Sequence, residues 1–275
     1  MSQQITVAQL NALLHSPKLK IFDAGLVLPG KSGEYAPAAV IKGAQRFDIK
    51  SALADNASPW PHTLCSAEQF EQQMQEAGVS QDSEVVVYDD QGLFSAARAW
   101  WMFKAFGFDN VKVLRGGLPA WRTAELPVQQ GWQTAEEQGN FKACPRADFF
   151  INTEQVQAAI DDASTLLLDA RPAQRFSGEM AEPRAGMRAG HIPNAKSLPY
   201  AELIIDGELR PQEQLQQALA QLLEQGVQRL QFSCGSGITA CILALAAYEC
   251  GHTNLQVYDG SWSEWGARHE LPLEK

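Results

Sequence analysis

Short apolar runs alternate along the chain with longer segments in which apolar residues recur every three or four positions. The runs predict six buried strands, namely Lys20–Asp23, Val85–Tyr88, Val111–Leu114, Leu166–Asp169, Leu230–Ser233 and Leu255–Tyr258. Helix starts are predicted where a capping residue precedes glutamine by three positions, at Thr6, Ser66 and Asn152. Helix ends are predicted just before Gly78, Gly107, Gly226 and Gly251. This alternation is typical of an α/β fold with a mostly parallel sheet flanked by helices.

The pattern occurs twice within the 275 residues. The segment from Val111 to Trp121 aligns with the segment from Leu255 to Trp265 at an offset of 144 positions. A repeat of this length indicates two copies of one domain rather than a solenoid. We expect the first domain over residues 1–130, a polar linker over residues 131–148 and the second domain over residues 149–275.

Candidate chemistry gathers in the loop Cys234-Gly-Ser-Gly-Ile-Thr239, between a predicted strand and an alanine-rich helix. Backbone N–H groups of such a loop and of a helix N-terminus attract anions, and they favour the thiolate form of Cys234. The alternative is a cysteine buried for packing alone, which does not explain Gly235 and Gly237. At the 144 offset Asp90 takes the place of Cys234, so we expect the first domain to be a non-catalytic copy.

Composition narrows the class of partner. A net charge of −10 and an isoelectric point near 5.0 argue against binding to nucleic acid or to an anionic membrane. The sequence shows neither a secretory signal nor an apolar window of about 18 residues, and its five cysteines are scattered. We therefore expect reduced thiols and a cytoplasmic location. Histidines are few and no C-x-x-C pair occurs, so no metal site is expected.

Several motifs resemble the tandem-domain rhodanese family of sulfurtransferases and, within it, the 3-mercaptopyruvate sulfurtransferase branch. The Cys234–Thr239 loop is similar to the C-G-S-G-V-T loop of that branch. The thiosulfate branch carries C-R-K-G-V-T, and Gly235 and Ser236 stand here in place of its two basic residues. Further family-like stretches begin at Ser95, Gly190 and Tyr258. The resemblance implies two tandem rhodanese-like domains, each with a mostly parallel sheet flanked by helices.

The resemblance also implies roles for individual residues. Cys234 matches the nucleophile, and Arg175 and Arg184 match the two arginines that bind the substrate. Forked guanidinium groups suit the carboxylate and carbonyl oxygens of a 2-oxo acid. The loop backbone is expected to hold the transferred sulfur, through Gly235, Gly237, Ile238 and Thr239.

The resemblance also implies a proton relay that involves a histidine. His62 matches a histidine near the active cysteine and, together with Ser236, would move a proton on or off the substrate. Lys50 stands where the family has an acidic partner for this histidine, and Asp48 lies nearby in the sequence. We therefore do not predict a complete Ser-His-Asp triad.

The implied reaction moves sulfur from 3-mercaptopyruvate, a 2-oxo mercapto acid, to a thiol such as thioredoxin or to cyanide. It passes through a Cys234 persulfide and releases pyruvate, with no cofactor. Two alternatives stay open, a thiosulfate:cyanide sulfurtransferase and a non-enzymatic persulfide carrier. A cysteine phosphatase is disfavoured because Ala240 stands where its C-x5-R loop needs an arginine.

Overall fold

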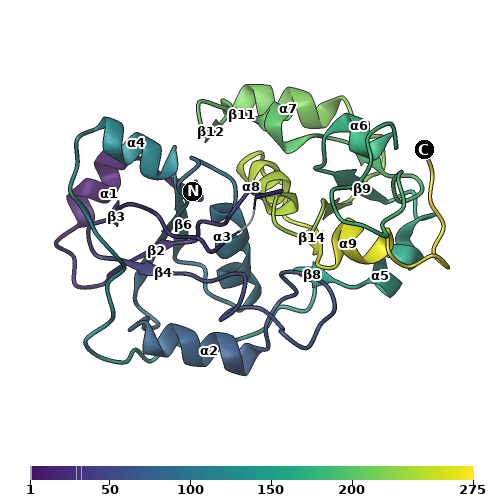
Figure 1. The fold of residues 1–275 in the computed structure, drawn as a ribbon. Helices are drawn as coiled ribbons and strands as arrows, with labels where there is room; N and C mark the ends of the chain where they lie inside the picture. Colours follow the sequence, from purple (N-terminus) through teal and green to yellow (C-terminus); the bar gives the residue numbers. More distant parts are fainter. Residues whose placement is uncertain (1, 29, 32) are drawn as a thin grey trace. The chain divides into compact units, whose positions relative to one another are not determined.

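The computed structural model describes residues 2–28, 30–31 and 33–275, which divide into two compact units. The first unit comprises the residues up to Asn56, then Leu64–Arg146, with the short segment Asp206–Glu208. The second unit comprises Ala57–Thr63, Ala147–Ile205 and Leu209–Lys275. Each unit is an α/β fold with a five-stranded parallel sheet (Figure 1).

The first sheet has the strand order β1-β6-β5-β2-β4, and all four pairings are parallel. Its strands are β1 (Gln4–Ile5), β2 (Leu19–Asp23), β4 (Ala44–Arg46), β5 (Glu84–Tyr88) and β6 (Val111–Leu114). The helices of this unit are α1 (Val7–Leu13), α2 (Ala67–Glu76), α3 (Ala96–Ala105) and α4 (Gly117–Thr123). A two-stranded antiparallel sheet is added by β3 (Val40–Ile41) and β7 (Val128–Gln129).

The second sheet has the order β10-β9-β13-β14-β8, which repeats the first strand for strand. Its strands are β8 (Phe150–Ile151), β9 (Thr165–Asp169), β10 (Lys196–Ser197), β13 (Arg229–Ser233) and β14 (Leu255–Tyr258). The helices are α5 (Thr153–Ala159), α6 (Ala173–Phe176), α7 (Gln212–Ala220), α8 (Ala240–Glu249), α9 (Ser261–Trp265) and the 3-10 turn η1 (Tyr200–Leu203). A small hairpin is formed by β11 (Ile204–Ile205) and β12 (Glu208–Leu209).

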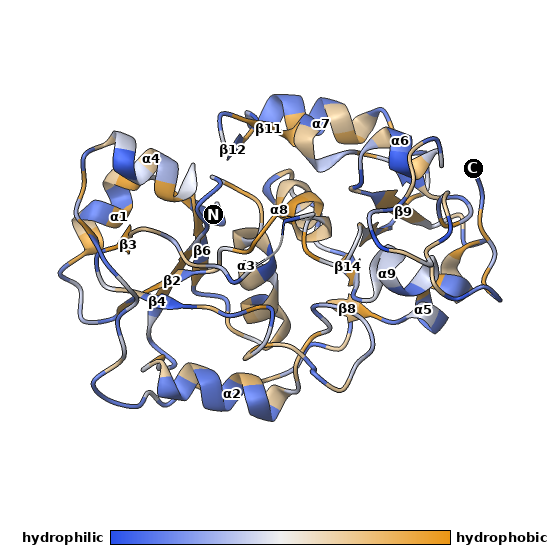
Figure 2. Ribbon diagram, viewed as in Figure 1, coloured by the Kyte–Doolittle hydropathy of each residue, from blue (hydrophilic) through white to orange (hydrophobic). Residues whose placement is uncertain are grey.

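Helices cover both faces of each sheet. In the first unit, Leu10 of α1 and Trp121 of α4 pack on one face, while α2 and α3 supply an aromatic cluster around Phe70 and Phe103 to the other. In the second unit, α5 and α9 share one core cluster, and α8 contacts β13 and β14. Figure 2 shows α8 as almost wholly apolar and α2 as two-faced, consistent with a buried helix and a surface helix respectively.

The six predicted strands are confirmed, each within one residue of its predicted start. Thr6 and Asn152 form complete capping boxes, whereas Ser66 caps α2 only through the N–H of Gln69. The glycines after α2, α3 and α8 have positive φ, as predicted for helix ends. The prediction at Gly226 is wrong, because α7 ends at Ala220 and Gly226 lies in a later turn.

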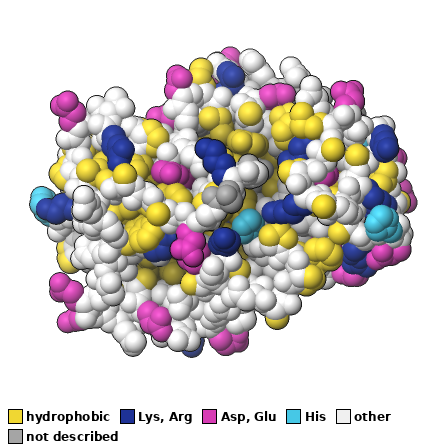
Figure 3. Space-filling model, viewed as in Figure 1, with side chains coloured by type: hydrophobic (Ala, Val, Ile, Leu, Met, Phe, Trp, Pro, Cys, Tyr) yellow, Lys and Arg dark blue, Asp and Glu magenta, His cyan; other side chains and the backbone are white. Residues whose placement is uncertain are grey.

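The surface carries charged side chains of both signs (Figure 3). On the face shown in Figure 3, basic and acidic side chains are interspersed with apolar ones. Among the described residues no helix is long and apolar enough to cross a membrane.

The segment predicted as a linker packs on the first unit up to Arg146. The N–H of Gly139 donates to the carbonyl of Gln75 (2.8 Å). Phe141 is fully buried, and its ring centroid lies 5.7 Å from that of Phe70 and 5.7 Å from that of Phe108. Residues 131–146 therefore belong to the first unit, and Phe141 fills part of its core.

We expect Phe141→Ala to lower the free energy of unfolding by about 3–4 kcal/mol, since a buried ring is replaced by a cavity. Gln138→Ala is the matched control, because Gln138 is exposed in the same segment and should change stability by less than about 0.5 kcal/mol. Thermal unfolding of the three proteins checks this. Equal stability of all three would show that the segment does not contribute to the core.

Candidate active site

Cys234 lies directly after β13, at the carboxyl end of the central strand of the second sheet. Its side chain is buried, with 1% of the residue exposed. The loop that follows turns at Gly237, whose φ of 73° favours glycine, and leads into α8. Crossover connections leave the carboxyl ends of parallel strands at one edge of the sheet, so this is where ligands bind in such folds.

The next strand–helix junction fixes the backbone around the cysteine. The hydroxyl of Ser261 accepts from the N–H of Cys234 (3.1 Å) and donates to the carbonyl of Tyr258 (2.8 Å). Trp262 and Ser263 donate their N–H groups to the carbonyls of Cys234 (3.0 Å) and Gly235 (2.9 Å). Ser261 has a φ of 48°, a left-handed conformation that costs about 1 kcal/mol for a non-glycine residue. These bonds hold it there and keep the loop in one conformation.

Both predicted substrate arginines lie beside this loop. A methyl group placed on Gly235 would lie 3.5 Å from Nη2 of Arg175, so that guanidinium faces the loop backbone. Arg184 donates from Nη1 to Oγ of Ser263 (2.5 Å), which itself donates to the carbonyl of Gly235. Arg184 is exposed as a whole residue, but partial desolvation of its guanidinium and the nearby charge of Arg175 lower its pKa, and the charge of Cys234 acts in the opposite direction. The two cations and the sulfur therefore interact.

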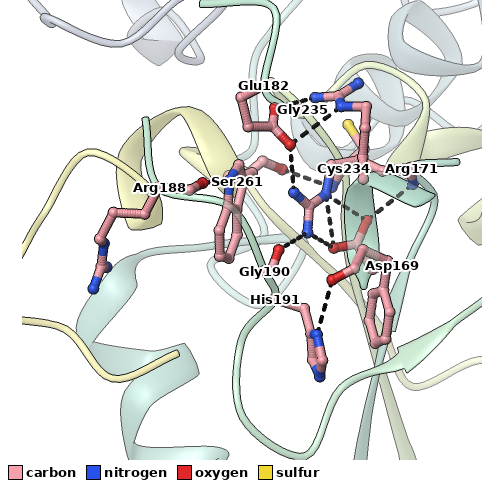
Figure 4. A network of polar contacts seen from close by, with 12 residues as sticks. Asp169, Arg171, Glu182, Arg188, Gly190, His191, Cys234, Gly235 and Ser261 are labelled. Atoms are coloured by element: carbon pink, nitrogen blue, oxygen red, sulfur yellow. Dashed lines mark hydrogen bonds and ion pairs between the residues drawn. The ribbon is translucent and has the colours of Figure 1, made fainter. Parts of the chain in front are cut away.

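A chain of buried ion pairs supports these groups (Figure 4). Arg171 pairs with Asp169 at the end of β9, with its Nη2 2.6 Å from Oδ2, and its Nη1 lies 2.8 Å from Oε1 of Glu182. Glu182 also pairs with Arg175. The guanidinium of Arg171 lies 4.2 Å from the ring centroid of Trp262, on α9. The chain thus ties the end of β9 to both α6 and α9.

His62 reaches the same loop. Its Nδ1 lies 3.2 Å from Oγ of Ser236, and the segment Ala57–Thr63 that carries it groups with the second unit. Thr63 closes a tight turn in this segment by donating to Oγ of Ser58 (2.8 Å) and to the carbonyl of Trp60 (3.1 Å). The structure therefore brings together the histidine and serine that the sequence pairs.

Asp48, which lies near Lys50 in the sequence, makes hydrogen bonds within its own turn. The carboxylate of Asp48 accepts the N–H groups of Lys50 (3.1 Å), Ser51 (3.3 Å) and Ala52 (3.4 Å). Arg46 lies 3.7 Å from the same carboxylate. Asp48 thus stabilises its own turn, and Lys50 is exposed.

The remaining predicted residues, Gly237, Ile238 and Thr239, form the backbone leading into α8. The carbonyls of Ile238 and Thr239 accept from the first turn of that helix, at Cys241 (3.1 Å) and Ile242 (3.0 Å). Thr239 is the N-cap residue but makes no side-chain capping bond. The loop therefore leads directly into the N-terminus of α8, the end of a helix that attracts anions.

The site residues that were not predicted include Asp169, Arg171, Glu182, Ser261 and Ser263. The two serines lie in a family-like stretch, yet nothing in the sequence shows which backbone they contact. Tyr200 begins η1, and burial together with the charge of Cys234 raises its pKa. Among the described residues, no group of three or more His, Cys, Asp or Glu side chains is arranged to hold a metal ion.

Comparison with known proteins identifies the family. The family model of the rhodanese-like domain matches the chain twice, over residues 6–124 and 152–268. The chain belongs to the rhodanese-like family.

Its relatives are sulfurtransferases, and so is this chain. The 3-mercaptopyruvate sulfurtransferase of Escherichia coli is 40% identical over 269 residues, which are 95% of this chain and 94% of the relative. The thiosulfate sulfurtransferase of Gallus gallus is 39% identical over 229 residues, covering 82% of this chain and 78% of the relative. The crystal structure of SseA from Escherichia coli, a 3-mercaptopyruvate sulfotransferase, matches with a TM-score of 0.85 at 35% identity. It covers 96% of this chain and 100% of that one.

The structure of the first unit contradicts the prediction that Asp90 takes the place of Cys234. β2 pairs Asp23 with Tyr88, and β9 pairs Asp169 with Ser233, so the residues that follow the central strands are Asp89 and Cys234. The carbonyl of Asp89 accepts from Leu118 (2.9 Å), as that of Cys234 accepts from Trp262. Asp89, rather than Asp90, therefore stands in place of the cysteine. The constant offset failed because the loop before α3 is one residue longer than the loop before α8.

Asp89 fills the corresponding cradle with its own negative charge. One carboxylate oxygen accepts the N–H groups of Phe94 (2.7 Å), Ser95 (2.9 Å) and Ala96 (2.9 Å), and the other accepts that of Gln91 (3.0 Å). The residue is fully buried. The first unit thus shows what this loop and helix start bind, namely an anion carried on the residue after the central strand.

We expect Asp89→Ala to lower the free energy of unfolding by about 2–4 kcal/mol, because four N–H groups lose their acceptor. Asp90→Ala is the matched neighbour. Burial and the charges of Asp89 and Asp23 raise the pKa of Asp90, so its ionised form destabilises the folded state at neutral pH. Asp90→Ala should therefore be neutral or stabilising at pH 7, and any gain should vanish at acid pH, where this carboxyl is protonated whether the chain is folded or unfolded.

Thermal unfolding at pH 7 and in acid checks both variants. A larger loss for Asp90→Ala than for Asp89→Ala would contradict the assignment of Asp89 to the cradle.

Proposed function

We propose that this protein transfers sulfur from 3-mercaptopyruvate to an acceptor through a persulfide on Cys234. The observation that supports this most is the meeting of Arg175, Arg184 and a buried cysteine at one loop without charged side chains. Two guanidinium groups suit the carboxylate and the adjacent oxo group of a 2-oxo acid. The donor named for the Escherichia coli relative has both groups.

In the first half-reaction, the thiolate of Cys234 attacks the sulfur of 3-mercaptopyruvate. The bond between that sulfur and the methylene carbon breaks, and its electron pair goes to the carbon as the enolate of pyruvate. The enolate takes up one proton, and the new persulfide releases the proton of the donor thiol. The atoms and electrons balance without an oxidant or reductant.

Each charge that develops has a partner at the site. The arginines hold the carboxylate and the enolate oxygen, while the loop N–H groups face the outer sulfur, as the cradle in the first unit faces Asp89. His62 and Ser236 lie within hydrogen-bond distance of each other and deliver the proton to the carbon. In the second half-reaction, a thiolate such as that of thioredoxin, or cyanide, attacks the outer sulfur and restores Cys234.

Thiosulfate is the second candidate donor, because a thiosulfate sulfurtransferase is 39% identical to this chain. Gly235 and Ser236 bring no positive charge to the loop, which disfavours a doubly charged donor. A persulfide carrier without turnover is the non-enzymatic alternative.

We expect kcat/KM for pyruvate release from 3-mercaptopyruvate to exceed kcat/KM for thiocyanate formation from thiosulfate and cyanide. Cys234→Ser should lower both activities by about a thousandfold or more, because the nucleophile is removed. Cys144→Ser is the control, since Cys144 is exposed in the first unit. A preference for thiosulfate would overturn the choice of donor, and turnover of neither donor would favour the carrier.

We also expect His62→Gln and Ser236→Ala to lower pyruvate release about 10- to 100-fold, because the enolate needs a proton. Sulfur transfer from methanethiosulfonate should change much less, since its sulfinate leaving group needs none. Parallel kinetics with the two donors separate a proton-transfer role from a structural one. An equal loss with both donors would contradict the relay.

A further inference from the structure

Glu182 is a buried carboxylate placed between two cations. Its side chain is 1% exposed, and it pairs with Nη1 of Arg171 through Oε1 and with Nη2 of Arg175 through Oε2. Nε of Arg175 also donates to Oε1 (3.2 Å). Figure 4 shows Glu182 facing the guanidinium of Arg171, near Gly235 and Cys234. A carboxylate so buried persists because its partners compensate the cost of desolvation.

The two arginines at the loop are held in different ways. Arg175 is bound by the negative charge of Glu182, whereas Arg184 donates to the neutral hydroxyl of Ser263. Arg175 therefore contributes hydrogen-bond donors with much of its charge cancelled. The charge of Arg184 is offset less, by the charges of Cys234 and Glu182, because its contact to Ser263 is not an ion pair.

The charges of the network can be counted. Three guanidinium groups, on Arg171, Arg175 and Arg184, face two carboxylates, on Asp169 and Glu182. One positive charge remains among these five side chains, and it is shared between the Cys234 thiolate and a ligand. Arg188 does not change this balance at the loop, because it donates to the carbonyls of four residues of the C-terminal segment and points away from Cys234 (Figure 4).

We propose that Glu182 determines donor specificity by cancelling the charge of Arg175, so that the site selects donors with one negative charge over donors with two. This inference rests on the proposed function. Glu182 lies outside the Cys234 loop. The side chains of that loop are neutral, so they do not alter the balance between guanidinium and carboxylate charges. At neutral pH, 3-mercaptopyruvate carries one carboxylate, and thiosulfate carries two charges.

Thiosulfate and methanethiosulfonate form the probe pair. Both carry a transferable outer sulfur, and replacing one oxygen by methyl reduces the charge from two to one. With either donor the Cys234 thiolate takes the outer sulfur, the S–S bond breaks, and sulfite or methanesulfinate leaves with the electron pair. Because both donors give the same persulfide, the ratio of their kcat/KM values with cyanide as acceptor reports the donor step alone.

Glu182→Gln keeps the size and hydrogen-bonding oxygen of the side chain but removes its charge. We expect the ratio of kcat/KM for thiosulfate to kcat/KM for methanethiosulfonate to rise about tenfold. Removing the negative charge of Glu182 leaves one more positive charge, partly screened, to attract the doubly charged donor. The rise should shrink at high salt. Glu182→Asp keeps the charge, so it should lower both activities while changing the ratio less than about threefold.

The outcomes are separable. An unchanged ratio in Glu182→Gln that still folds by thermal unfolding would overturn the inference, as would an equal rise in Glu182→Asp. If Glu182→Gln does not fold, the wild-type ratio decides, because a preference for thiosulfate over methanethiosulfonate contradicts a site with one net charge. Pyruvate release from 3-mercaptopyruvate is measured separately, so its absence rejects the proposed function and not the charge selection.

Discussion

A chain of buried ion pairs, from Asp169 through Arg171 and Glu182 to Arg175, determines what the second unit can bind. It starts at the end of β9, the neighbour of the central strand β13, and ends at the loop that carries Cys234. Each member is held by the one before it, so the guanidinium at the loop is fixed without relying on a mobile surface contact. The same chain sets the local charge, and hence the class of anion that can approach the sulfur.

The two units apply one anion-binding geometry in different ways. In the first, the carboxylate of Asp89 occupies the N–H groups ahead of α3, and that unit carries its anion permanently. In the second, the equivalent residue is Cys234, whose backbone is held by Ser261 and Trp262 from the neighbouring strand–helix junction. A persulfide at Cys234 would place a negative sulfur where the first unit places a carboxylate oxygen. The two copies thus differ in the residue after the central strand and in the length of the loop that follows it.

The sequence predicted the strands and the nucleophilic loop because both leave local signals, apolar runs for the first and glycines around Cys234 for the second. Ser263 and Glu182 could not be assigned, since their roles depend on contacts with residues distant in the sequence, such as Gly235. Phe141 was missed because a single aromatic residue in a polar segment has no periodicity. An alignment at a constant offset does not detect one inserted residue, so it points to Asp90 instead of Asp89.

In the proposed reaction, sulfur from the donor becomes bonded to Cys234. The intact mass of the protein after addition of one equivalent of 3-mercaptopyruvate, without an acceptor, tests this step. We predict a gain of one sulfur atom located on the peptide that contains Cys234, accompanied by an equal amount of pyruvate and reversed by cyanide. Pyruvate formed without the added mass, or added sulfur on another cysteine, would contradict the account.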